Sequence, residues 1–386
     1  MAIFEIPQLP HQGVVLGVGD LGLVQDMVEM LMPPQFAAQL IHFTPRIFHG
    51  TLNYNLNEAG GENTITEYRS TVLIYNPRAG KFGRSGTAIL DRAVQILKKN
   101  GHTVTVAPTT GPATAGAIAR EHIAAGADLI VAAGGDGTIN EIVEGMVHSH
   151  VPLAILPAGT ANVLAMEMKL GSRMERVAER LEECQPYRIP VGRLTCDGGR
   201  VSRHFMLMAG IGLDAHIVYN VNGAIKARIG KLAYWVAGWS LLGKRLVHFT
   251  AELSGSRREC SFALITKVRN YGGDFEIARN VSLFDDEFEV VLLEGRSTIR
   301  YVKYFAGMAS NCLTGMKGAT VLRSDRVTLT NPEGARIYVQ IDGEFAGHLP
   351  AEVGIVPDAL TLLIPPEYSR ASNAPALARG RSSDSA

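Results

Sequence analysis

The sequence predicts two folded parts: an α/β domain with a parallel sheet wrapped by helices, and a second domain built as a mainly antiparallel β-sandwich. Apolar strand-like and amphipathic helix-like segments alternate from Thr71 onward with short connections, which indicates the first part. Many short strand-like segments separated by turns begin at residue 188, which indicates the second. Ligands bind beyond the carboxyl ends of parallel strands, so we expect a functional site at that edge of the first sheet.

The elements of the first part follow from this alternation in chain order. The predicted strands cover residues 71–75, 103–107, 128–133 and 152–156. The predicted helices cover residues 87–99, 113–125, 138–147, 161–168 and 173–184. Short connections between such segments favour a parallel sheet, because each helix returns the chain to the start of the next strand.

The second part is predicted to be rich in short strands. They cover residues 188–194, 203–209, 248–254, 260–266, 288–293, 319–323, 326–330, 336–341 and 359–364. Helical interruptions are predicted at residues 226–245 and 298–310. The resulting domain prediction has four segments: an extension of no assigned function (1–68), the α/β domain (69–190), the β-rich domain (191–366) and a disordered tail (367–386).

Composition limits the classes of protein to consider. The 386 residues are enough for two domains, and 37 basic residues balance 37 acidic ones, which argues against a nucleic-acid partner. The four cysteines form no CxxC pair, which favours reduced thiols in the cytoplasm. The N-terminus lacks the pattern of a secretory signal, and the apolar stretch at residues 232–243 is too short to span a bilayer. We therefore expect a soluble protein, attached at most to a membrane surface.

The most informative motif is Gly-Gly-Asp-Gly-Thr at residues 134–138, between a predicted strand and a predicted helix. Glycines at a helix start let a phosphate approach backbone N–H groups. Asp136 beside such a site suggests work on Mg²⁺ or on an attacking hydroxyl, and Thr138 can cap the helix or bind a phosphate oxygen. The motif indicates a nucleotide-using phosphotransferase; the alternative is a tight strand-to-helix turn.

Two further loops of this kind follow predicted strands. Asn-Pro-Arg-Ala-Gly-Lys at residues 76–81 combines turn residues with a positive charge and is either a generic turn or a phosphate contact. In the other loop Gly159 and Thr160 precede a helix, so a second helix N-terminus can face the same anion.

These three motifs, in this order and spacing, resemble the diacylglycerol kinase and sphingosine kinase family of lipid kinases, particularly its bacterial branch. The similarity covers residues 70–365. In the second part it rests on the segments at residues 209–215, 270–273, 283–290 and 340–344.

The resemblance implies a nucleotide domain, a β-rich lipid-binding domain and a cleft between them. The residues that it implies for ATP are Asn76, Pro77, Arg78, Ala79, Gly80, Lys81, Thr109, Gly134, Gly135, Asp136, Gly137, Thr138, Asn140 and Thr160. It also implies a general base in the Asp-Gly-Glu segment, where we favour Glu344 with Asp342 as its partner and Asp136 as a Mg²⁺ or network carboxylate. Without the resemblance, Asp342 and Gly343 would be interpreted as a hairpin turn.

A structural Mg²⁺ site is also implied by the resemblance, with Asp285 and the carbonyl groups of Ser282 and Glu287 as ligands. Two residues depart from the family pattern. Asp286 stands where the family usually has glycine, which puts the metal site in question if the turn needs a positive φ. Val163 stands where many relatives have aspartate, so an acidic network through that side chain is missing.

The segment at residues 225–245 holds both tryptophans, with basic residues at its ends. It suits a helix lying on an anionic membrane surface, or a helix packed on the β-rich domain with its basic ends reaching solvent. The functional prediction is an ATP- and Mg²⁺-dependent kinase of phospholipid biosynthesis that phosphorylates a lipid hydroxyl, of diacylglycerol or a related lipid, at the inner face of the membrane. A homodimer is left open. The alternatives are an NAD kinase-like enzyme with a soluble substrate, and a catalytically silent nucleotide or lipid binder.

Overall fold

The computed structural model describes residues 68–374, apart from residues 83–85, 214, 216–245, 272–274, 296–299, 302, 305–306, 308–311, 332–333 and 373. The chain divides into the units Met1–Thr64 and Ile65–Ala386, and the described residues belong to the second. The predicted extension up to residue 67, the segment at 225–245 and most of the predicted tail and of the helix at 298–310 lie outside the described residues. The prediction of disorder is wrong for residues 367–371, which are helical because Tyr368 packs into the core. The predicted domain boundaries stay predictions.

The first part contains the predicted parallel sheet. Its strands β1 (Ser70–Tyr75), β2 (Thr103–Pro108), β3 (Leu129–Gly134) and β4 (Leu153–Pro157) pair in parallel in the order β2-β1-β3-β4. All six residues of β3 are buried. A central parallel strand has both faces covered, which explains why its sequence is a continuous apolar run without alternation.

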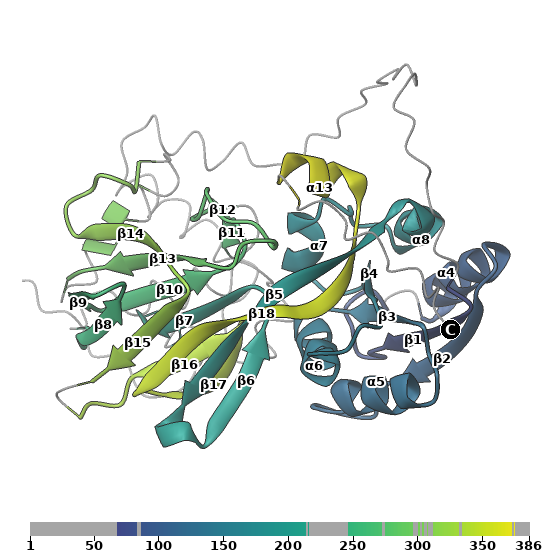
Figure 1. Cartoon of the computed structure of the whole chain (residues 1–386), viewed down its shortest axis with the longest axis horizontal. Helices are drawn as coiled ribbons and strands as arrows, with labels where there is room; N and C mark the ends of the chain where they lie inside the picture. Colours follow the sequence, from purple (N-terminus) through teal and green to yellow (C-terminus); the bar gives the residue numbers. More distant parts are fainter. Residues whose placement is uncertain are drawn as a thin grey trace, which may run out of the picture. The chain divides into compact units, whose positions relative to one another are not determined.

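Helices cover both faces of this sheet (Figure 1). Leu73 and Val131 pack with α4 (Ala88–Lys99) and α8 (Met174–Glu179), whereas Ile74 and Ile130 pack with residues of the helices on the opposite face. Those helices are α5 (Ala115–Ala124), α6 (Asp136–Met146) and α7 (Val163–Glu167). The period-two alternation of strand side chains produces the two layers.

The parallel sheet continues into the β-rich part through a long strand, β18 (Ala351–Ile364). β18 lies parallel to β4 through Leu362 and Leu153, and antiparallel to β5 (Gln185–Cys196) along most of its length. Figure 1 shows β5 and β18 running side by side from the helix-covered strands to the β-rich part. β6 (Val201–Phe205), β15 (Arg326–Thr330), β8 (Phe249–Leu253) and β9 (Ser256–Cys260) complete this ten-stranded sheet.

A second, antiparallel sheet of six strands faces the β-rich end of the first. Its order is β14 (Ala319–Ser324), β13 (Phe288–Leu293), β10 (Phe262–Thr266), β7 (Met208–Gly212), β16 (Tyr338–Ile341) and β17 (Glu344–His348). One apolar cluster joins the sheets: Phe249 and Val353 come from the first, and Ile265 and Val290 from the second. The predicted β-sandwich is therefore confirmed. The short β11 (Asn270–Tyr271), β12 (Phe275–Glu276) and α13 (Pro366–Ala371) lie outside both sheets.

Several predicted strands differ from the observed ones. The predicted strand at 203–209 is two strands, β6 and β7, and β9 and β17 were not predicted. β18 starts eight residues earlier than predicted: the prediction began at residue 359 and the strand begins at Ala351. The register of β18 shifts between Val356 and Leu360, so Pro357 and Asp358 lie at an irregularity where a proline in a strand is tolerated.

Candidate active site

Three loops at the carboxyl ends of β1, β3 and β4 lie together, as predicted from their strand positions. The N–H of Lys81 donates to the carbonyl of Ala158 at 3.1 Å, and the N–H of Gly159 donates to the carbonyl of Gly134 at 3.1 Å. The backbone of one loop is thus bonded to that of the next. Main-chain hydrogen bonds therefore help to fix the conformation of this edge.

Glycines allow the loop after β3 to turn directly into α6. A Cβ on Gly134 would lie 2.6 Å from the Cβ of Thr138, and a Cβ on Gly159 would lie 2.5 Å from the Cα of Gly135. Gly135 is the N-cap of α6, and Asp136 is its first residue. The first N–H groups of a helix have no carbonyl partner within it, so this turn presents donors and the positive end of the helix dipole to the loop edge.

Polar side chains surround this turn. The side-chain amide of Asn76 donates to the hydroxyl of Thr138 at 3.3 Å, and its carbonyl oxygen accepts from the N–H of Arg78 at 2.9 Å. Asn140 is buried, and its side-chain oxygen has no hydrogen-bond donor in the structure. Thr160 is exposed, with its hydroxyl close to Gly80. A cradle closed to side chains, with the N–H groups at the start of α6 beside it, fits a phosphate-bearing ligand.

Lys81 holds the loops together. Its ammonium group donates to the carbonyl oxygen of Pro157 at 2.7 Å and to that of Ser172. Burial lowers the pKa of Lys81, and the charge of Glu175 opposes the shift. In this structure the two hydrogen bonds of the ammonium group thus go to backbone carbonyls of the loops.

The other predicted nucleotide residues lie around the same edge. Ala79 is buried in the apolar core beneath the loop, whereas Pro77 and Arg78 are exposed. Thr109 follows β2, and its N–H donates to the carbonyl of Tyr75 at 2.8 Å. Thr109 and Pro77 therefore lie at the carboxyl ends of adjacent strands.

The Asp-Gly-Glu segment forms a two-residue hairpin turn between β16 and β17. Asp342 and Gly343 have φ values of 49° and 81°, and Ile341 pairs with Glu344. Two consecutive positive φ values are typical of a type I′ turn, which explains the Asp-Gly dipeptide. The hairpin interpretation of these residues is correct for their conformation, and it does not exclude a chemical role.

The carboxylate of Asp342 is held by backbone N–H groups. One oxygen accepts from Leu207 at 3.0 Å and from Met208 at 2.9 Å, and the other accepts from Met206 at 3.0 Å. Burial raises the pKa of Asp342 to about 7; the three N–H donors oppose this shift, and the charge of Asp136 adds to it. With both oxygens already accepting hydrogen bonds, Asp342 is better suited to fixing the hairpin than to accepting a substrate proton.

Glu344 is exposed and reaches the start of α6. A Cβ on Gly137 would lie 2.5 Å from Oε1 of Glu344, so a carboxylate from the sandwich lies against the glycine turn of the parallel sheet. Oε2 of Glu344 lies 3.6 Å from the guanidinium of Arg203. On the same turn, Oδ1 of Asp136 accepts from the N–H of Leu164 at 3.3 Å. The structure thus brings Glu344 and Asp136 to the same end of α6.

Strand β6 contacts both α6 and Glu344. The N–H of His204 donates to Oε2 of Glu144 on α6 at 2.7 Å. Burial alone would raise the pKa of Glu144, but hydrogen bonds from His204 hold it below its usual value. Arg203, the residue before His204, is the partner of Glu344, so one strand contacts both the helix and the carboxylate.

The residues predicted for a structural Mg²⁺ site form a turn closed by side chains of the protein. The carboxylate of Asp285 accepts from the N–H of Ser282 at 3.1 Å and from its hydroxyl at 2.9 Å. Arg323 pairs with the same carboxylate at 2.9 Å and with Glu287 at 3.0 Å. The ammonium of Lys267 donates to the carbonyl of Asp285 at 2.7 Å. Two cationic side chains at the expected position of a dication do not fit a magnesium site.

Two further observations concern this turn. Asp286 has no positive φ, so an aspartate in place of glycine causes no backbone strain there. Burial lowers the pKa of Lys267 to about 7, although the charges of Asp285 and Asp286 oppose the shift. Among the described residues, no group of three or more His, Cys, Asp or Glu side chains could hold a metal ion.

Sequence reasoning missed three residues at these sites: Arg203, Lys267 and Arg323. Lys267 carried a usable signal, because it follows the fully buried strand at residues 262–266 and precedes buried Val268. A lysine inside an apolar run is buried only when something pairs with it. Arg203 and Arg323 carried no such signal, since their partners lie far away in the sequence.

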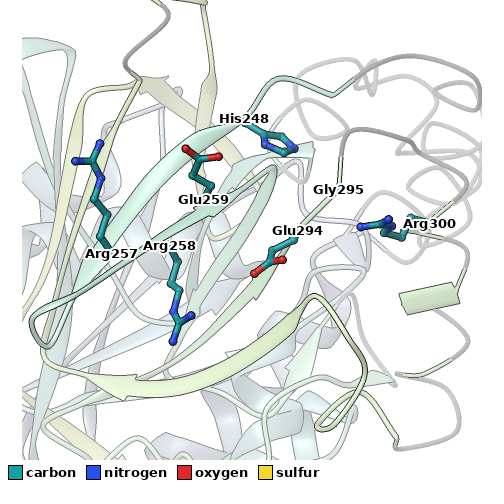
Figure 2. Close-up of a pocket in the computed structure, with 7 residues that line it drawn as sticks. All are labelled: His248, Arg257, Arg258, Glu259, Glu294, Gly295 and Arg300. Atoms are coloured by element: carbon teal, nitrogen blue, oxygen red, sulfur yellow. The ribbon is translucent and has the colours of Figure 1, made fainter.

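Figure 2 shows a separate pocket of about 620 Å³ in the β-rich part. None of the predicted site residues lines it; its lining residues are His248, Arg257, Arg258, Glu259, Glu294, Gly295 and Arg300. Arg257 and Arg258 leave β9 in different directions, so their charges do not converge on one point. The ring nitrogens of His248 are buried without a hydrogen-bond partner. The predicted nucleotide and catalytic residues are therefore not part of this pocket.

Two family models match consecutive parts of the chain. Residues 70–194 match the diacylglycerol kinase catalytic domain, and residues 208–364 match the YegS C-terminal NAD kinase β-sandwich-like domain. Residues 70–194 thus belong to the diacylglycerol kinase catalytic family. It is accordingly an enzyme, a lipid kinase with a hydroxyl group as phosphate acceptor, and the family implies ATP as phosphate donor. The predicted family and fold class are confirmed.

Individual relatives of the kinase agree with the models. The chain is 27% identical to a diacylglycerol kinase of Bacillus subtilis (strain 168) over 292 residues, which are 72% of this chain and 91% of the relative. It is 27% identical over 248 residues to one of Mycobacterium tuberculosis, covering 63% of this chain and 79% of the relative. A crystal structure of a diacylglycerol kinase from Bacillus anthracis str. Sterne aligns with a TM-score of 0.65 and 21% identity, over 78% of this chain and 99% of that one. At 21% identity, the similarity to this crystal structure shows a common fold and nothing further.

No helix among the described residues of this kinase is long and apolar enough to cross a membrane. The comparisons do not assign roles to individual residues, so the roles of Glu344, Asp342, Asp136 and the loop residues stay predictions.

Proposed function

We propose that this kinase transfers the γ-phosphate of ATP to a hydroxyl group of a membrane lipid, diacylglycerol or a close relative. Family membership supports the reaction class, and the names of the relatives support the lipid. The observation that carries the proposal for the site is the contact between Glu344 and Gly137. It joins an exposed carboxylate of the β-sandwich to the glycine turn at the start of α6.

The residues around this contact divide the chemistry between them. The N–H groups at the start of α6 and the helix dipole would hold phosphate oxygens. Glu344 would orient the lipid hydroxyl and accept its proton, and Arg203 would keep the carboxylate in place. Asp342 would act as a positioning residue, because its oxygens fix the hairpin that carries Glu344.

Mg²⁺ is part of the proposal as the companion of ATP. When bound, it neutralises charge on the transferred phosphoryl group. Asp136, at the first position of α6, is the carboxylate that would hold it beside the phosphates. This proposal is separate from the turn at Asp285, whose side chains do not fit the ion.

Access to a lipid hydroxyl requires contact with a bilayer. We include peripheral contact with an anionic membrane surface, at the inner face, in the proposal; the segment at residues 225–245 that suggested it lies outside the described residues. The homodimer stays a prediction.

The test is a phosphotransfer assay on the full chain with ATP, Mg²⁺ and vesicles that contain a panel of lipid acceptors, read by mass spectrometry. We expect a phosphorylated lipid from the diacylglycerol class. Asp136→Ala should abolish the product, whereas Glu352→Gln, at an exposed ion pair on β18, should leave the rate unchanged. Transfer that is unaffected by Asp136→Ala would contradict the proposed site.

One observation favours a second candidate, an enzyme with a soluble substrate. The model that matches residues 208–364 is described as NAD kinase β-sandwich-like. Phosphorylation of NAD without vesicles, at a rate above that of any lipid, would decide for this candidate. Stabilisation by ATP without transfer to any acceptor would support the silent binder.

A further inference from the structure

The turn at residues 282–287 carries a feature that the proposed reaction does not use. The carboxylate of Asp285 pairs with Arg323 on β14, and the carbonyl of Asp285 accepts from Lys267, which directly follows β10. We infer that this kinase stabilises the turn with Lys267 and Arg323 in place of a structural magnesium ion.

The first argument is the saturation of the Asp285 carboxylate. Oδ1 accepts from the hydroxyl of Ser282, and Oδ2 accepts both from the N–H of Ser282 and from the guanidinium of Arg323. The carbonyl of Ser282 in turn accepts from the N–H of Asp285 at 3.2 Å. The expected ligand oxygens of Asp285 and Ser282 are therefore already hydrogen-bonded within the protein.

The second argument is the position of Lys267. The residue is fully buried, and its ammonium group reaches the carbonyl of Asp285. Its own N–H donates to the carbonyl of Leu207 at 2.8 Å, so its backbone is fixed by the adjacent strand connection. A buried lysine needs a partner, and Asp285 supplies a carbonyl oxygen of the kind that would otherwise coordinate a hard cation.

The third argument is that Arg323 joins both ends of the turn. Its guanidinium donates to the carbonyl of Asn280 at 2.8 Å and to Asp285 at 2.9 Å, and it forms an ion pair with Glu287 at 3.0 Å. A planar guanidinium binds several oxygens at once in a fixed geometry, which a bound metal would otherwise do. A dication at this place would be repelled by the guanidinium of Arg323 and by the protonated form of Lys267.

The experiment measures thermal unfolding of the full chain without nucleotide, in EDTA and across a Mg²⁺ titration. We expect no saturable Mg²⁺-dependent rise of the midpoint in the wild type, and no retained magnesium by elemental analysis after gel filtration. A saturable rise that Asp285→Asn removes would overturn the inference.

Variants of the cations provide the second measurement. Lys267→Met and Arg323→Met should each lower the midpoint by several degrees in EDTA, whereas Arg326→Met, at an exposed pair on β15, should not. If Lys267→Met does not fold, Arg323→Lys replaces it in the comparison. This variant keeps the positive charge but loses the planar guanidinium that binds several oxygens at once. Unchanged midpoints in the Lys267 and Arg323 variants would also overturn the inference.

Discussion

Asp342 shows how one residue can serve conformation and electrostatics together. Its left-handed φ makes the hairpin turn, and its carboxylate accepts three backbone hydrogen bonds at the junction of β6 and β7. The Asp-Gly pattern predicted the turn, but the amide partners could not be foreseen, because they lie more than 130 residues earlier in the chain.

The pKa of Asp342 predicts a pH-dependent stability. Burial raises it from 3.8 to about 7, so the folded protein holds this proton more tightly than the unfolded chain. The contribution of the bound proton to the free energy of unfolding is complete below about pH 4 and is lost as the pH rises through about 7. Relative to Asp342→Asn, the free energy of unfolding of the wild type should fall over this interval, by at most about 1.4 kcal/mol per pH unit. If the free energy of unfolding from urea denaturation depends on pH in the same way in the wild type and in Asp342→Asn, the raised pKa is contradicted.

Gly137 tests the contact with Glu344. A Cβ at this position would lie 2.5 Å from Oε1, the mobile end of a side chain, so Gly137→Ala should displace the carboxylate without disturbing the backbone. A displaced base loses alignment, and we expect kcat to fall at least tenfold with little change in the unfolding midpoint. Gly354→Ala on β18 is the control, because the only contact found for its Cβ is an ordinary one, 3.9 Å from the carbonyl oxygen of Asp325, and its φ is not positive. Equal activity in both variants would show that the contact is not needed.

At the scale of elements, α5 and α6 approach each other through backbone atoms. A Cβ on Gly145 would lie 2.2 Å from the carbonyl oxygen of Gly116, and that oxygen cannot move as a side chain can. Gly145→Ala should therefore lower the free energy of unfolding by about 1–3 kcal/mol through overpacking. Urea denaturation checks this, again with Gly354→Ala as control; a variant as stable as the control would show that the two helices can separate without loss of stability.

Elements with strong periodicity were predictable and irregular ones were not. The four parallel strands and the helices α4 and α5 lie within about two residues of their predicted ends, because apolar runs and turn residues delimit them. The first half of β18 was missed because it contains Gly354 and Pro357. β17 was missed because it has only five residues and contains Glu344 and Gly347, which are unfavourable in strands.

For the molecule as a whole, an ion pair between a buried carboxylate and a partly exposed guanidinium links the helix-covered part to the β-rich part. Glu167 of α7 is almost fully buried and accepts from the backbone N–H and the guanidinium of Arg269, and from the hydroxyl of Tyr368 on α13. Removing the cation leaves a buried carboxylate with fewer donors, which is unfavourable.

Arg269→Met should therefore lower the free energy of unfolding by about 2–3 kcal/mol. Arg92→Met, which removes the exposed pair with Glu175, should change it by less than about 1 kcal/mol. Chemical denaturation of the two variants makes the comparison. An equal loss of free energy of unfolding in the two variants would mean that burial of Glu167 does not strengthen its ion pair with Arg269.

The site as a whole was predictable at the level of its loops. Three glycine-containing loops at successive strand ends predicted a common edge, and the backbone contacts between them confirm it. The partners of Glu344 and Asp285 were not predictable, because ion pairs between distant strands depend on register and sheet order, which the sequence shows only weakly.

The central claim is that Glu344 is the base that acts on the lipid hydroxyl. The most direct measurement is the turnover of Glu344→Gln with saturating ATP, Mg²⁺ and diacylglycerol vesicles, beside Glu352→Gln. The account predicts that kcat of Glu344→Gln falls by about 10²–10⁴ while its unfolding midpoint stays within about two degrees of the wild type. A kcat equal to that of Glu352→Gln would contradict the account.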